Sequence, residues 1–394
     1  MLTNEFCKIF PKRGYRFYCT IVEAQFKKFN FRRVILLKKR TRYELEKLQY
    51  PDISEKQFEH IIRKRGSDFD LLFTTHQRQK SFTKGLISKF KEIGTIVDVV
   101  DRTIYGKECV DWADLVVTSG GDGTFLLGAS HIKDREKPII GFNNDPDRSS
   151  GILCLGKKYS LHPEMAIQKL LKNEFSWLYR TRIEVHLTGT RAHEDCVELD
   201  QWPQPISPGA SRPQNSKDIN VVTTCVPFLA LNEVFAGECL ASQVSYLVMD
   251  VPGIVRTKVK CSGLCVSTGT GSTSWHMSIN RLSLAKVHRI LELACVEKSP
   301  ADIVKITNNF NNSLQFSPDD PRLFYTLRDL ICLGVWPDPP GIPSDAFTPS
   351  LSVMSKCYAA NLVIDGTRAY PFNDGTVATM CSRPQNMLKT INLH

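Results

Sequence analysis

Short apolar runs alternate with helical patterns through the first half of the chain. The run inside "RRVILLKK" (32–39) is bounded by charged residues and predicts a buried strand. Further strands are predicted at 95–100, 113–119 and 137–143. Helical spacing predicts helices at 43–49, 55–66, 82–94 and 125–133, and a last amphipathic helix at 161–175. Strands that alternate with helices predict a parallel sheet covered on both faces.

Beyond this last helix the apolar positions recur every second residue, as in antiparallel strands. Such strands are predicted at 180–189, 229–237, 242–251 and 256–268, and the turn at Val251–Gly253 is typical of a hairpin. The fold class predicted is therefore an α/β N-terminal domain with a Rossmann-like parallel sheet, followed by an all-β, sandwich-like domain.

The same pattern divides the chain of 394 residues. We expect a basic N-terminal segment at 1–31, the α/β domain at 32–175, the β-rich domain at 176–376 and a C-terminal tail at 377–394 that packs on the α/β domain. Two proline-rich, aperiodic stretches at 191–220 and 335–350 are expected to be flexible surface insertions.

Charge, cysteine and histidine content limit the partners, the compartment and the metal sites that we expect. A net charge of +10 suits anionic partners, or reflects a generally basic surface. No nucleic-acid-binding motif is present and no apolar stretch is long enough to span a bilayer, so we expect neither nucleic acid nor membrane as a partner. Thirteen cysteines without a C-x-x-C pair favour reduced thiols inside a cell, and nine histidines without an H-x-x-x-H pair predict no metal site.

The N-terminal segment is basic, aromatic and poor in acidic residues, as mitochondrial transit peptides are. A disordered basic tail explains the same composition. The stretch Arg16–Cys19 resembles a cleavage site for the matrix protease, which favours the transit peptide.

Glycine concentrates at one strand–helix boundary, "TSGGDGTFLLGAS" (118–130). Gly120, Gly121 and Gly123, followed by Thr124, lie at the carboxyl end of a predicted parallel strand, where ligands bind in open α/β sheets. Backbone N–H groups of such a loop, together with a helix N-terminus, attract phosphate. The Walker A lysine is missing and the G-x-G-x-x-G spacing fails, so neither common nucleotide fingerprint applies.

Asp122 lies inside this loop, where a carboxylate opposes bound phosphate unless it has a chemical task. That task would be to accept the proton of a hydroxyl that attacks a phosphoryl group. Phosphoryl transfer passes through a loose transition state, so even a weak base is sufficient if it is well positioned. The alternative is a tight turn in which Asp122 caps the helix.

Later motifs extend the pattern: "GFNNDPDRSSGILCL" (141–155), "ALNEVFAGE" (230–238), "SGLCVSTGTGSTSWHMSINR" (262–281) and "LVIDGTRAYPFNDGT" (362–376). In this order they resemble the NAD kinase family, and specifically its mitochondrial type, over nearly the whole chain from about Arg32. The resemblance implies transfer of the terminal phosphoryl of ATP, or of polyphosphate, to the 2′-hydroxyl of the adenosine ribose of NAD. It also implies a mitochondrial matrix location and a homodimer. The missing Walker lysine implies that Mg²⁺ bound with ATP, together with basic side chains, offsets the charge of the donor triphosphate.

The resemblance assigns roles to individual residues. Asp122 matches the aspartate that receives the hydroxyl proton, and the glycines with Thr124 match the phosphate loop. Asn232 and Glu233 match the pair that holds the adenine and ribose of NAD, chemistry that an amide and a carboxylate can supply. Thr273, Ser274 and Ser278 match the motif that lines the adenine pocket. Without the other motifs, a turn at the end of a strand is the alternative for Asn232 and Glu233. The serine-rich motif alone is as often a plain loop.

Three positions depart from the general family: Gly269 replaces a proline, Trp275 a tyrosine and Ser262 an aspartate near the nicotinamide ribose. Asp365 and Asp374 are interpreted as turn formers. Basic residues for the donor triphosphate are not marked by any motif, and Arg102, Lys107 and Arg148 are the candidates. A diacylglycerol-type lipid kinase and an inactive NAD-binding protein remain as alternative functions, and the choice between NAD and NADH stays open.

Overall fold

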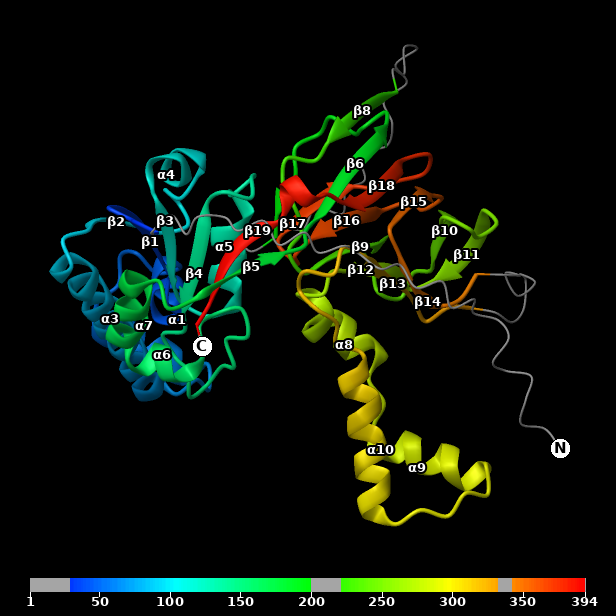
Figure 1. Cartoon of the computed structure of the whole chain (residues 1–394), viewed down its shortest axis with the longest axis horizontal. Helices are drawn as coiled ribbons and strands as arrows, with labels where there is room; N and C mark the ends of the chain where they lie inside the picture. The colour runs from blue at the N-terminus through cyan, green and yellow to red at the C-terminus, as the bar shows by residue number, and fades with distance from the viewer. Residues whose placement is uncertain (1–28, 200–220, 332–341, 394) are drawn as a thin grey trace.

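The computed structural model describes residues 29–199, 221–331 and 342–393. Figure 1 shows helices around one sheet at one end of the molecule and two further sheets beside it. The N-terminal segment expected to be a transit peptide lies almost entirely outside the described residues, as do residues 200–220 and 335–341 of the two proline-rich stretches. None of the described helices is long and apolar enough to cross a membrane.

The first sheet has six strands in the order β2-β1-β3-β4-β19-β5. Strands β1 to β4 are parallel, β19 runs parallel to β4, and β5 is antiparallel to β19. The strands are β1 (Arg33–Lys38), β2 (Ile96–Val100), β3 (Leu115–Ser119), β4 (Pro138–Phe142), β5 (Ser176–Arg180) and β19 (Leu388–Asn392). The parallel sheet predicted from the alternating pattern is confirmed.

Helices cover both faces of this sheet, because side chains point alternately to either side along each strand. On one face Leu36 and Val117 pack against Leu86 of α3 and Leu170 of α7. On the other, Leu37 and its neighbours pack against α4 and α5. The helices are α1 (Arg42–Leu48), α2 (Glu55–Lys64), α3 (Phe69–Glu92), α4 (Lys107–Trp112), α5 (Asp122–Ser130), α6 (Lys157–Leu161) and α7 (Pro163–Lys172).

The second half contains two antiparallel sheets, ordered β11-β10-β15-β18-β6-β8 and β14-β13-β12-β9-β16-β17-β7. A single apolar cluster, which includes Val185, Met249, Val266 and Leu362, joins residues of both sheets. The strands are β6 (Ile183–Gly189), β7 (Val197–Glu198), β8 (Val222–Cys225), β9 (Glu233–Glu238), β10 (Ser245–Asp250), β11 (Thr257–Cys261), β12 (Gly263–Ser267), β13 (Leu323–Arg328), β14 (Asp345–Thr348), β15 (Ser350–Ser355), β16 (Ala360–Ile364), β17 (Arg368–Pro371) and β18 (Val377–Ser382). The expected sandwich-like architecture is confirmed.

The structure differs locally from the sequence pattern. Short strands β7 and β14 lie in stretches that were expected to be flexible, because each pairs with the edge of a sheet. Between β12 and β13 the chain forms three α-helices, α8 (Trp275–Asn280), α9 (Leu284–Leu293) and α10 (Pro300–Ser313), where no helix was predicted. Figure 1 shows α9 and α10 extending away from both sheets.

The two halves are joined by a buried arginine, Arg182, at the start of β6 (1% exposed). Its guanidinium donates to the backbone carbonyls of Ala129 (3.5 Å) and Ile132 at the end of α5, and of Asp134 (3.2 Å). It also donates to the carbonyl of Asn386, just before β19 (2.5 Å). One side chain therefore ties α5, β6 and the C-terminal segment together.

Candidate active site

The glycine loop connects β3 to α5. A Cβ atom on Gly120 would lie 2.3 Å from the Thr124 hydroxyl oxygen, so this position has no room for a side chain. Gly121 and Gly123 differ: a Cβ on Gly121 would meet only Ser149 Oγ at 3.7 Å, and one on Gly123 would meet nothing within 4 Å. The loop thus has one tightly packed glycine and two that face open space at a helix N-terminus, where anions bind.

Asp122 is the first residue of α5, and its carboxylate has a fixed position. One carboxylate oxygen accepts from the backbone N–H of Ile152 (3.1 Å) and the other from that of Leu153 (2.8 Å). Asp122 does not cap its own helix through its side chain, since the N-cap residue is Gly121. The carboxylate instead bridges the loops that follow β3 and β4.

Asn232 and Glu233 lie at the start of β9, where the Asp365 carboxylate fixes their backbone by hydrogen bonds. The Asp365 carboxylate accepts from the backbone N–H groups of Leu231 (2.8 Å), Asn232 (2.8 Å) and Glu233 (3.2 Å). Asp365 has a φ of 47°, which agrees with its interpretation as a turn former. The sequence gives no signal for its second role, because its partners lie more than a hundred positions away in the chain.

Two acidic side chains share this buried environment. Burial and the neighbouring Asp365 raise the pKa of Glu233 to about 8, although hydrogen bonds from Ser274 and the Trp275 backbone oppose the rise. Burial also raises the pKa of Asp365, against the lowering effect of its three backbone donors. Within the described residues, Asn232 Oδ1 and Glu233 Oε2 are buried without a hydrogen-bond partner. Unsatisfied buried acceptors of this kind mark a site that a ligand completes.

The late motif packs directly on Asn232. The Thr268 hydroxyl donates to the Leu231 carbonyl (2.6 Å) and accepts from the Gly271 N–H (3.1 Å). A Cβ on Gly271 would lie 2.1 Å from the carbonyl oxygen of Asn232, so only glycine permits this approach. Of the residues expected to line the pocket, Thr273 ends a 3-10 helix and Ser274 precedes α8, next to Glu233, whereas Ser278 lies a turn further on and is exposed.

The departures from the general family have structural explanations in two cases. A Cβ on Gly269 would lie 1.8 Å from the carbonyl oxygen of Ser317, which excludes a proline there. The Trp275 ring stacks on Phe235 of β9, with centroids 4.5 Å apart. Ser262 lies in the turn between β11 and β12, and nothing in the structure explains its substitution.

The motifs converge at the junction of the two halves. Leu231 is fully buried in the same apolar cluster as Phe125 of α5 and Leu153, whose N–H holds Asp122. Arg180, at the end of β5, reaches the Thr270 hydroxyl of the late motif (3.4 Å). Burial lowers the pKa of Arg180 to about 10, and the nearby Asp122 opposes this shift. Sequence reasoning missed Arg180, since no motif surrounds it.

A cavity of about 540 Å³ opens on the other side of the glycine loop. Arg148 lines it, whereas the other two candidates for the donor triphosphate do not: Arg102 follows β2 and Lys107 begins α4. Lys39, directly after β1, lines the cavity and was not predicted. Its position after a strand end was the available signal.

Groups of possible metal ligands are rare in the described parts of the chain. The one group of three found there is Glu184, His186 and Cys225, on β6 and β8 rather than at the glycine loop. The Glu184 carboxylate already binds His186 (2.7 Å) and Arg383 (3.0 Å), so the Arg383 guanidinium supplies positive charge beside it.

Comparison with known proteins finds similarity to NAD kinases. The model of the ATP-NAD kinase N-terminal domain matches residues 52–144. NAD kinase 2, mitochondrial, from Homo sapiens is 35% identical over 376 residues, which covers 92% of this chain and 84% of that protein. The Rattus norvegicus protein of the same name is 34% identical over 380 residues, covering 92% and 87%.

Solved structures show the same fold. An NAD kinase from Archaeoglobus fulgidus in complex with ATP has a TM-score of 0.52 at 15% identity, covering 92% of this chain and 94% of that one. These similarities give no support to a lipid kinase. With 34–35% identity to two kinases over nearly its full length, the chain belongs to the NAD kinase family.

Proposed function

We propose that this chain is an NAD kinase that transfers the terminal phosphoryl group of ATP to the 2′-hydroxyl of the adenosine ribose of NAD. The observation that carries the proposal is the fixed Asp122 carboxylate at the junction of the glycine loop, Asn232 and Glu233. In the reaction the bond between the γ-phosphorus and the bridging oxygen breaks. A bond from the ribose oxygen to phosphorus forms, and Asp122 takes the hydroxyl proton.

The acceptor dinucleotide binds at the late motif in this proposal. The unpartnered Oδ1 of Asn232 accepts from the adenine amino group, and the Glu233 carboxyl accepts from ribose hydroxyls. Thr273 and Ser274 line the adenine side, and Ser278 contributes at the exposed edge. The Trp275–Phe235 stack supplies a flat apolar wall next to Glu233. NADH offers the same adenosine chemistry, so the site admits both redox forms.

Donor phosphates lie along Gly121 and Gly123, whose open faces leave room for them, while Gly120 and Thr124 shape the loop. No group of three possible metal ligands lies at this loop within the described residues. Such a site fits Mg²⁺ that arrives bound to ATP, since Mg²⁺ commonly binds substrate phosphates and keeps several waters. The ion would offset phosphate charge. Polyphosphate remains a second donor that the loop chemistry allows.

The test is Asp122→Asn, which keeps the size of the side chain. In a coupled NADP-formation assay we expect the turnover number to fall about 100-fold or more, as for loss of a general base. NAD binding, measured by calorimetry, should be unchanged. Asp250→Asn, an exposed substitution at the end of β10, serves as the charge-matched control. Near-normal turnover by Asp122→Asn would refute the assigned role.

A mitochondrial location follows from the names of the relatives and from the basic N-terminal segment, and we propose the matrix specifically. A fusion of residues 1–31 to a fluorescent protein should reach the matrix, and cytosolic fluorescence would contradict this. We also propose a homodimer, as the family resemblance implies. Light scattering coupled to gel filtration should give twice the 44.6 kDa chain mass.

A further inference from the structure

The outer face of β6 carries polar side chains that the phosphoryl-transfer site does not use. Along this strand Val185 and Leu187 point into the apolar core between the two sheets, so Glu184 and His186 lie on the opposite face. Strand β8 pairs with β6, and Cys225 lies directly opposite His186. Figure 1 shows the two strands side by side. A carboxylate, an imidazole and a thiol therefore share one face of the sheet.

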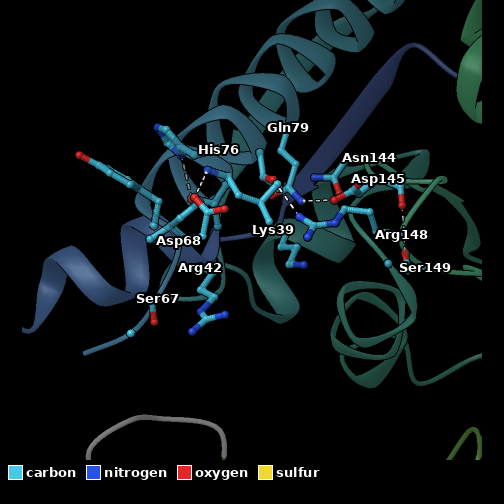
Figure 2. Close-up of a pocket in the computed structure, with 17 residues that line it drawn as sticks. Lys39, Arg42, Ser67, Asp68, His76, Gln79, Asn144, Asp145, Arg148 and Ser149 are labelled. Atoms are coloured by element: carbon cyan, nitrogen blue, oxygen red, sulfur yellow. Dashed lines mark hydrogen bonds between the residues drawn. The ribbon is translucent and has the colours of Figure 1, made fainter. Parts of the chain in front are cut away.

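This face is separate from the cavity beside the glycine loop. Figure 2 shows that cavity with Lys39 and Arg148, which belong to the N-terminal half of the chain. Neither β6 nor β8 contributes a side chain to it. A ligand on the face of β6 is therefore distinct from the donor and acceptor nucleotides.

The three side chains have the spacing of a metal site. One oxygen of Glu184, one ring nitrogen of His186 and the sulfur of Cys225 all lie within 4.8 Å of one another. Ligand atoms bound tetrahedrally to Zn²⁺ at about 2.0–2.3 Å lie roughly 3.3–3.8 Å apart. Side-chain movements of about 1 Å on fixed strands would therefore close the site. A thiolate and an imidazole in the set favour zinc over Mg²⁺ and Ca²⁺, which prefer oxygen ligands.

The ligand atoms are also accessible to an ion. The Cys225 sulfur makes only a long contact to the Val226 carbonyl (3.8 Å), and this residue is exposed. The Nε2 atom of His186 lies 2.7 Å from Glu184 Oε1, so one proton joins the two side chains. A metal ion can take the place of that proton. Since the histidine is only partly buried, water can fill the fourth position.

Arg383 is the competitor of an ion at this position. Its Nε atom lies 3.0 Å from Glu184 Oε1, and its side chain is half exposed. Exposed ion pairs contribute little to stability, so an ion can displace the arginine into solvent. The other oxygen of Glu184 accepts from the Asn386 side chain, which holds the carboxylate in place.

We propose that Glu184, His186 and Cys225 bind a divalent ion of the zinc class, with water as the fourth ligand. Strand β8 has four residues and ends the order of its sheet. The ion joins this edge strand to β6 through side chains, in addition to the backbone pairing. Because the ligands come together only in the folded chain, the ion should raise the melting temperature.

Zinc affinity of the full-length chain, freed of metal with a chelator, tests the site by competition with a chromophoric chelator. We expect Cys225→Ser and His186→Ala each to weaken Zn²⁺ binding at least about tenfold. Arg383→Met removes the competitor and should strengthen it about two- to fivefold. With Co²⁺ as the probe, the wild type should show the near-ultraviolet band of a thiolate ligand, and Cys225→Ser should lose it.

Cys295→Ser and His60→Ala, at exposed positions outside the site, are the matched controls and should keep zinc affinity within twofold. Circular dichroism and the melting temperature without metal verify the fold of each variant. Zinc affinities of Cys225→Ser and His186→Ala within twofold of the wild type would overturn the site, as would a cobalt band that survives in Cys225→Ser. Weaker zinc binding by Arg383→Met would do the same. None of these readouts depends on NADP formation.

Discussion

Replacing Glu233 by glutamine should stabilise the ligand-free protein at alkaline pH while weakening NAD binding. Glu233 is buried with Asp365 beside it, and both effects raise its pKa from 4.5 to about 8. The folded protein therefore keeps this carboxyl protonated at pH values where the unfolded chain ionises it. Glutamine removes the titration and keeps an oxygen for the donors at Ser274 and Trp275.

The sign and size of the effect follow from the pKa difference. A raised folded-state pKa contributes stability that is fully present below pH 4.5 and is lost as the pH rises through about 8. At 1.36 kcal/mol per pKa unit, the loss between pH 5.5 and 8.5 is at most about 3 kcal/mol. Coupling to Asp365 and access of water reduce it, so we expect Glu233→Gln to gain about 1–3 kcal/mol on the wild type across this interval.

Urea unfolding of both proteins at pH 5.5 and 8.5, without nucleotide, measures this gain directly. Glu174→Gln, at an exposed position, should change stability by less than about 0.5 kcal/mol at either pH. A difference between Glu233→Gln and wild type that does not grow with pH would refute the buried, protonated state. Adding NAD should raise the melting temperature of the wild type much more than that of Glu233→Gln, because ligand-linked stabilisation follows affinity.

Three further results are expected from the packing. Arg182→Met should destabilise the protein by about 3–5 kcal/mol in urea unfolding, because four backbone carbonyls, two of them in buried contacts, lose their donor. Exposed Arg383→Met should cost less than about 1 kcal/mol. Gly120→Ala should lower the melting temperature through its clash in the loop, while Gly123→Ala should keep stability and lose NADP formation. Gly269→Pro, which restores the general family residue, should also destabilise, since its Cβ would lie 1.8 Å from a carbonyl oxygen; an unchanged melting temperature would contradict this.

Sequence patterns predicted the strands and helices that bury either one face or both faces. The strands β1 and β3 are continuous apolar runs because both faces of the sheet are covered. Helix α3 was predicted only from 82 onward, although it begins at Phe69. Its first half carries His76 and Gln79 toward the cavity, and a polar stretch that lines a site interrupts the apolar period. The helices α9 and α10 had readable start signals, serine N-caps followed in α10 by a proline, that were missed.

The sequence predicted only those parts of the candidate site whose residues lie next to one another in the chain. The glycine loop and the Asn232–Glu233 pair stand out as motifs, and the structure places both at one junction. Asp365 and Arg180 act through contacts between distant segments, so neither spacing nor residue type could assign them. Their partners depend on which strands become neighbours, and this is set by the global topology.

Strand β19 lies between β4 and β5, one strand in from the edge of the first sheet, although it follows every other strand of that sheet in the chain. The N-terminal half is therefore not a self-sufficient piece of sequence. A fragment that stops before Leu388 would leave a gap inside this sheet, with backbone groups of the buried strand β4 and of β5 unpaired. The sheet that carries the glycine loop is complete only once synthesis has reached β19, so a chain shortened before Leu388 lacks one of its strands.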